Sequence, residues 1–193
     1  MSGKVITEWG HPIYNRCYCD SLVIISEQVV IPDKVNKRIT IYSLTGKVIK
    51  HIPCSVIGKK HTAMCSVDNN SIIISDKDIS LVSRVNLSSG QVMWSCKDIV
   101  SPLGVTCYGG DYVLVASCST KIISLLDIKT GKVKGELADQ VLNDGNWSFS
   151  QVCVGNTLAI ANYNTLLFFL NDLYLVSKAG ISSPQVIGQK VNA

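Results

Sequence analysis

The feature that most constrains the fold is a short segment around a glycine turn that recurs along the whole chain. It appears around Gly46 as SLTGKVIKHI, around Gly90 as NLSSGQVMWSC and around Gly131 as DIKTGKVKGEL. The chain opens on a similar piece, SGKVITEW, around Gly3. These glycines are separated by 43, 44 and 41 residues, and a further step of 41 reaches Asp172 in FLNDLYLVSK. The chain is therefore a repeat protein with a period in the low forties.

The content of one repeat indicates which repeat fold this is. Each repeat consists of short apolar runs separated by Gly, Asp, Asn and Ser, which is typical of strands joined by turns. Stacked helix pairs of similar length would instead show apolar residues every three or four positions. A strand-and-turn unit of this length is typical of one four-stranded blade of a β-propeller. We therefore predict an all-β protein with a β-propeller fold.

The repeat spacing predicts four complete four-stranded blades and one orphan N-terminal strand. The strand leaves two arrangements open: the C-terminal part of a larger propeller, such as a six-bladed one, or a four-bladed ring with a spare strand. In an open arc, the exposed blade edges would favour self-association. The predicted segments are an orphan outer strand at residues 1–9, blades at residues 10–52, 53–96, 97–137 and 138–178, and a C-terminal tail at residues 179–193.

The middle strands of the repeats are apolar on both faces. The runs IIIS, VLVA and LLFF do not alternate, and stacked blades bury both faces of their middle strands. Each Thr-Gly or Ser-Gly is expected to close the last hairpin of its blade, with the glycine in the left-handed region. In the first repeat we expect strands at residues 14–19, 22–26, 38–43 and 47–51 and a long loop at residues 27–37; in the last, an outer strand at residues 173–178.

Charge and hydropathy give an expected compartment. The formal net charge of +4 permits an anionic partner without demanding one. No apolar leader precedes Glu8, and the longest apolar run, residues 158–170, is too short to span a bilayer. We therefore expect a cytoplasmic protein.

The eight cysteines include no C-x-x-C pair. Cys17, Cys65, Cys107 and Cys153 occupy similar places near the end of each first strand, which indicates a packing position. We expect reduced, buried thiols in a reducing compartment, with no structural zinc site and no cofactor.

Residues 101–127, SPLGVTCYGGDYVLVASCSTKIISLLD, resemble an NHL-type repeat. The aspartate usual after the second strand of that pattern is Ser117 here and Asp76 in the second repeat. The endings VNLSSGQVMWS and LDIKTGKVK also resemble quinoprotein-like and WD-type blades. Together the chain is similar to the propeller end of the tripartite-motif (RING, B-box, coiled-coil) proteins of invertebrates. The residues that match the NHL-type pattern are Pro102, Gly104, Val105, Gly109, Gly110 and Asp111.

This resemblance implies a module that recruits a protein partner, or RNA, at the substrate-recruiting end of a ubiquitin ligase. In that family the RING transfers ubiquitin. No RING or B-box spacing occurs in this chain, so the resemblance does not carry ligase activity to it.

Catalysis has little support in the sequence. Hydrolytic propellers place several His, Asp or Glu residues around the central channel to hold a metal, whereas His11, His51 and His61 lie in loops or an outer strand. Asp76 and Asp78 lack the spacing and the glycine of a calcium loop. We predict that the protein is not an enzyme. The alternatives are a metal-dependent propeller hydrolase or lyase, and a truncated propeller with no independent function.

A binding surface is better supported, because topology gives its position. Loops between successive repeats and loops between second and third strands emerge on the same face of a propeller. In the first two repeats these loops are basic, whereas the matching loop of the fourth holds Asp139 and Asp144. We predict that this face meets an acidic protein segment or a nucleic-acid backbone; the alternative is a solvated lysine-rich rim. The predicted partner-binding residues are Lys34, Lys37, Arg38, Lys59, Lys60, His61, Lys77 and Trp147.

Overall fold

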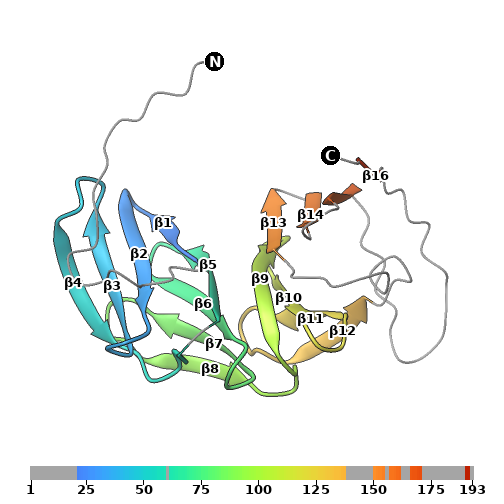
Figure 1. Ribbon diagram of the computed structural model, residues 1–193, viewed down its shortest axis with the longest axis horizontal. Helices are drawn as coiled ribbons and strands as arrows, with labels where there is room; N and C mark the ends of the chain where they lie inside the picture. Colours follow the sequence, from blue (N-terminus) through green and yellow to red (C-terminus); the bar gives the residue numbers. More distant parts are fainter. Residues whose placement is uncertain are drawn as a thin grey trace, which may run out of the picture.

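The structure, a computed structural model, describes residues 21–59, 61–137, 150–154, 157–161, 166–170 and 190–191. The helices and strands in these ranges are all β-strands, and they form four four-stranded antiparallel sheets, each in chain order (Figure 1). The first sheet contains β1 (Val23–Ile25), β2 (Gln28–Asp33), β3 (Arg38–Ser43) and β4 (Val48–Pro53). The second contains β5 (Thr62–Asp68), β6 (Ser71–Asp76), β7 (Leu81–Asn86) and β8 (Val92–Cys96). The third contains β9 (Pro102–Tyr108), β10 (Tyr112–Ser117), β11 (Ile123–Asp127) and β12 (Val133–Leu137). The fourth contains β13 (Ser150–Val154), β14 (Thr157–Ala161), β15 (Leu166–Leu170) and β16 (Lys190–Val191).

The four sheets are arranged as the blades of a propeller. The first strands of successive sheets contact one another, β1 with β5, β5 with β9 and β9 with β13. The fourth strands β4, β8 and β12 lie on the outside of the arc that the sheets follow (Figure 1). The predicted all-β, partial propeller fold is therefore confirmed. The predicted orphan strand at residues 1–9 lies outside the described residues.

The hydrophobic core lies between the blades. One cluster of buried aliphatic side chains joins the first and second sheets, and another joins the second and third. In β6, Ile72 and Ile74 belong to the first cluster and Ile73 to the second, and each of them is at most 1% exposed. The prediction that the middle strands bury both faces is thus confirmed for this strand, and it explains why the sequence there does not alternate.

The recurring glycines occupy the left-handed region, as predicted. The φ angle is 82° at Gly46, 75° at Gly90 and 70° at Gly131. The last residue of the preceding strand stabilises this turn: the carboxylate of Asp127 accepts hydrogen bonds from the backbone N–H (2.8 Å) and the hydroxyl (2.9 Å) of Thr130. Each blade therefore ends on a locally encoded hairpin.

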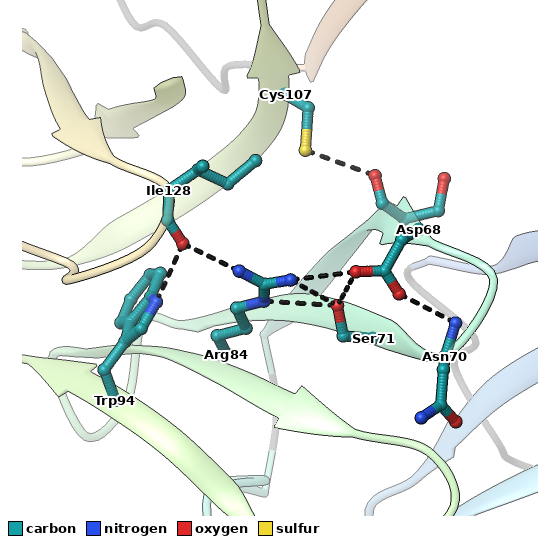
Figure 2. Close-up of polar contacts among 8 residues, drawn as sticks. Asp68, Asn70, Ser71, Arg84, Trp94, Cys107 and Ile128 are labelled. Atoms are coloured by element: carbon teal, nitrogen blue, oxygen red, sulfur yellow. Dashed lines mark hydrogen bonds and ion pairs between the residues drawn. The ribbon is translucent and has the colours of Figure 1, made fainter. Parts of the chain in front are cut away.

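Polar side chains also join neighbouring blades. From the second blade, Arg84 Nη1 and Trp94 Nε1 both donate to the carbonyl oxygen of Ile128 in the third, at 3.1 and 3.0 Å (Figure 2). From the first blade, Lys50 Nζ donates to the carbonyl oxygen of Leu87 in the second, at 3.4 Å. Leu87 and Ile128 hold the same place, directly after the third strand of their blades, so this contact between blades repeats.

The prediction for the first repeat was wrong in one respect. Residues 27–37, expected to form a loop, contain β2, which pairs with both β1 and β3. Ser26 and Glu27 make the two-residue turn between β1 and β2, with φ angles of 47° and 60°. Such turns are usually marked by Asn or Gly, and Pro32 argued against a strand, so the sequence carries no clear hairpin signal here. The strand expected to be second in this sheet is therefore its first.

The last sheet is completed by residues from the predicted tail. Strand β16 pairs with β15 through Val191 opposite Leu166 and Lys190 opposite Leu167. The strands expected at residues 14–19 and 173–178 lie outside the described residues.

Candidate interaction face

One face of the propeller is formed by the turns between second and third strands and by the connections between blades. We call it the turn face. The backbone N–H of Cys54 donates to the carbonyl oxygen of Lys37 at 2.9 Å, and that of Lys77 to the carbonyl oxygen of His61 at 3.0 Å. These bonds tie the two kinds of loop together, as the topological argument requires. The turn face comprises residues 34–37, 54–59, 61, 77–80, 97–101 and 118–122 and the adjoining Arg38.

The structure brings six of the eight predicted partner-binding residues to the turn face. The other two, Lys60 and Trp147, lie outside the described residues, as do Asp139 and Asp144, so the expected contrast in charge with the fourth repeat stays a prediction. The six are Lys37, Lys59 and His61, which are exposed, and Lys34, Arg38 and Lys77, which are half-buried.

The carboxylate of Asp76 supports the part of the turn face that carries Lys59 and Lys77. Asp76 is fully buried at the end of β6. It accepts hydrogen bonds from the backbone N–H of Gly58 (2.6 Å), the hydroxyl of Thr62 (2.9 Å) and the backbone N–H of Ile79 (3.3 Å). Both carboxylate oxygens therefore bind backbone and hydroxyl donors of the fold, which is a structural role.

Asp33 has the same place at the end of β2 and supports the neighbouring turn. Its carboxylate accepts hydrogen bonds from the side-chain amide of Asn36 and from Arg38 Nε, both at 2.8 Å. Burial raises the pKa of Asp33, but the bonds from Asn36 and Arg38 and the positive charge of Arg38 outweigh it, so that the net pKa is lowered. Because Arg38 is paired with a buried carboxylate, it adds less positive charge to the face than its sequence position implied.

Acid is expected to remove the contribution of Asp33 to stability. A carboxyl group whose pKa is lowered by folding stabilises the protein above its unfolded pKa, 3.8 for Asp33, and loses this effect as the pH falls through the folded value. Wild type should therefore melt at a higher temperature than an Asp33→Asn variant at neutral pH, and the difference should shrink below about pH 4. Thermal melts of both proteins across this range provide the measurement. A difference that grows on acidification would contradict this assignment.

Exposed aliphatic side chains are a feature of the turn face that the sequence reasoning missed. Val35 is 67% exposed, Ile79 47% and Val100 56%. The backbone N–H of Ser101 donates to the hydroxyl of Ser80 at 3.2 Å, which brings together the segments that carry Ile79 and Val100. The available signal was an apolar residue inside a turn or connection, where polar residues are usual.

The described residues offer no evident metal centre. In that part of the chain, no three His, Cys, Asp or Glu side chains are grouped so that they could hold a metal ion. His51 lies on the outer strand β4, with Nδ1 at 3.1 Å from the hydroxyl of Thr40. None of the elements described is a helix with the length and hydropathy to cross a membrane. The absence of enzymatic activity stays a prediction.

Comparison with known proteins supports the fold. No protein family and no curated protein matches the sequence. The chain is similar to the WD40 β-propeller domain of Doa1, with a TM-score of 0.56 and 15% identity over 70% of this chain and 44% of that one. It is similar to virginiamycin B lyase from Staphylococcus aureus, with a TM-score of 0.60 and 12% identity over 90% of this chain and 55% of that one.

A third similar structure is the computationally designed Ika4 protein, with a TM-score of 0.57 and 17% identity over 88% of this chain and 98% of that one. The chain thus spans about half the length of the two natural proteins and nearly all of the designed one. At these identities the likeness supports the β-propeller fold alone. The NHL-type and tripartite-motif resemblance remains an interpretation of the sequence.

Proposed function

We propose that this propeller is a non-catalytic interaction module that binds an acidic, partly apolar protein segment on its turn face. The observation that carries the proposal is that lysines and exposed aliphatic side chains share this face. Lys37 and Lys59 would pair with carboxylates of the partner, while Val35, Ile79 and Val100 would contact its aliphatic side chains. Exposed apolar groups with charge around them are typical of protein-interaction sites, whereas a merely solvated rim needs only the lysines.

The support beneath the turn face favours binding. Asp33 and Asp76 hold the two basic turns through several hydrogen bonds each. A surface that is already ordered loses little conformational entropy when a partner binds, so more of the contact energy appears as affinity.

The finer part of the proposal concerns the partner. The resemblance to the propeller end of tripartite-motif proteins supports a module that recruits cytoplasmic protein substrates for a ubiquitin ligase. The ligase chemistry would come from a RING, whose residue spacing this chain lacks. RNA is the second candidate, because its phosphates would also be attracted by the lysines.

Reversing exposed lysines of the turn face is expected to weaken binding of an acidic peptide. The probe is a fluorescein-labelled peptide of alternating Glu and Leu residues, titrated at low salt by fluorescence anisotropy. The double variant Lys37→Glu/Lys59→Glu should raise Kd about tenfold, or ~1.4 kcal/mol, because two attractive charges become repulsive. The control Lys47→Glu/Lys129→Glu makes the same charge change at exposed hairpin residues of the opposite face and should leave Kd within about twofold.

Two outcomes would contradict the proposal. An equal loss in both double variants would mean that net charge, not the turn face, attracts the peptide. A Val35→Ser/Ile79→Ser variant should weaken peptide binding but leave binding of a single-stranded RNA unchanged. Tighter binding of RNA than of peptide, with no effect of the serine substitutions, would assign the face to nucleic acid.

A further inference from the structure

Cys65 and Cys107 were expected to hold equivalent packing positions, but the structure places them in different registers. Cys65 pairs across its sheet with Ile73, and Cys107 pairs with Val113. Strands β6 and β10 begin 41 residues apart, at Ser71 and Tyr112, whereas the two cysteines are 42 residues apart. A shift of one residue along a strand turns a side chain to the other face of the sheet.

The two thiols therefore face each other between the second and third blades. Ile73 and Val113, their cross-strand neighbours, belong to the same buried cluster at that interface, and both cysteines pack against it. The two sulfur atoms are 3.7 Å apart, and strands β5 and β9 that carry them are in contact. Both residues are half-buried, unlike Cys54 and Cys96, which are buried. A disulfide would need the sulfurs to approach to about 2.0 Å.

The surroundings make the two thiols unequal. A hydrogen bond from Cys65 lowers the pKa of Cys107; burial opposes this, and the positive charge of Arg84 adds to it. The pKa of Cys65 is raised well above its ordinary value by the same hydrogen bond and by burial. Arg84 is held near Cys107 by Asp68, with Nη2 at 2.8 Å from the carboxylate, and by Ser71, with Nη2 at 2.9 Å from the hydroxyl (Figure 2).

We propose that Cys65 and Cys107 form a reversible disulfide site that covalently joins the second and third blades, with hydrogen peroxide as the oxidant. The thiolate of Cys107 attacks peroxide: an S–O bond forms, the O–O bond breaks and hydroxide leaves, so that the sulfur is oxidised to sulfenic acid. Cys65 then loses its proton and attacks the Cys107 sulfur; the S–S bond forms, the S–O bond breaks and water leaves. Two equivalents of a thiol reductant restore both cysteines.

This site is independent of the turn face, since it lies between first strands rather than in the basic loops. Its two roles follow from the geometry: Cys107 reacts first because it is the better thiolate, and Cys65 resolves the product because it stays protonated in sulfur contact with it. Among the cysteines that the structure describes, this is the pair with a sulfur–sulfur contact.

The test uses the full chain treated with equimolar hydrogen peroxide. Remaining thiols are blocked with N-ethylmaleimide, and non-reduced peptides are mapped by mass spectrometry. We expect one dominant cross-linked pair, Cys65 with Cys107, with two hydrogen atoms lost and full reversal by dithiothreitol. The control Cys118→Ser, at another half-buried cysteine, should give the same cross-link. Several cross-links of similar abundance, or none, would overturn the proposal.

Single variants test the assigned roles. In Cys65→Ser, Cys107 should accumulate as sulfenic acid that dimedone traps. In Cys107→Ser, reaction of Cys65 with peroxide should be at least about tenfold slower, because that thiol is protonated and less reactive. Equal rates in the two variants would overturn the assignment of Cys107 as the reacting thiol. Circular dichroism checks that each variant folds, and the cross-link map of the wild type decides the proposal if one does not.

Discussion

Replacing Gly131 with alanine is expected to lower the free energy of unfolding by about 3–4 kcal/mol, of which ~1 kcal/mol is left-handed strain and the rest is overpacking. The φ angle at Gly131 is 70°, and an added Cβ would lie 2.6 Å from Cδ2 of Trp94 in the preceding blade. Trp94 cannot easily move aside, because its Nε1 donates to the carbonyl oxygen of Ile128 at 3.0 Å. The substitution therefore disturbs both a turn and the interface between two blades.

A matched glycine separates these two causes. Gly110 has a φ angle of 79°, and an added Cβ there would meet nothing within 4 Å. Gly110→Ala should therefore cost only the strain, about 1 kcal/mol. Urea denaturation of wild type and both variants provides the measurement. Equal losses at the two positions would mean that the blades do not pack closely at Gly131.

Replacing Asp76 with alanine is expected to lower the free energy of unfolding by about 3 kcal/mol, because buried donors lose their acceptor. Asp76 is 0% exposed, so water cannot readily replace the carboxylate at the N–H of Gly58 and the hydroxyl of Thr62. The same change should loosen the segment that carries Lys59 and weaken peptide binding on the turn face.

Two further variants serve as controls for Asp76. Asp98→Ala removes an exposed carboxylate of the turn face and should change stability by less than about 0.5 kcal/mol. Asp76→Asn keeps one acceptor oxygen and should fall between wild type and Asp76→Ala. These free energies can be measured by urea denaturation, with thermal melts as a second readout. A loss for Asp98→Ala as large as for Asp76→Ala would show that burial is not the cause.

The candidate face could be predicted in position but not in content. Its position follows from strand order, because loops that join the same ends of strands emerge on one side. Two features of its content depend on three-dimensional contacts: the guanidinium of Arg38 pairs with buried Asp33, and Val35 remains 67% exposed. A lysine-rich loop sequence does not distinguish a paired cation from an exposed one, because burial depends on neighbouring elements.

The sequence by itself determined the architecture of this protein. The glycine spacing predicts the repeat, the non-alternating run at Ile72–Ile74 predicts strands buried on both faces, and the turn residues predict where most hairpins close. Each of these signals is local, since a turn or a strand face is encoded within a few residues.

The tertiary structure alone decided which side chains meet between blades. The turn at Ser26 and Glu27 forms without glycine because β2 pairs on both sides with its neighbours. Cys65 and Cys107 meet because the third blade is offset by one residue from the repeat period of the cysteines. The physical reason is that side chains alternate along a strand, so contacts between sheets depend on a register that pairing across the whole fold sets.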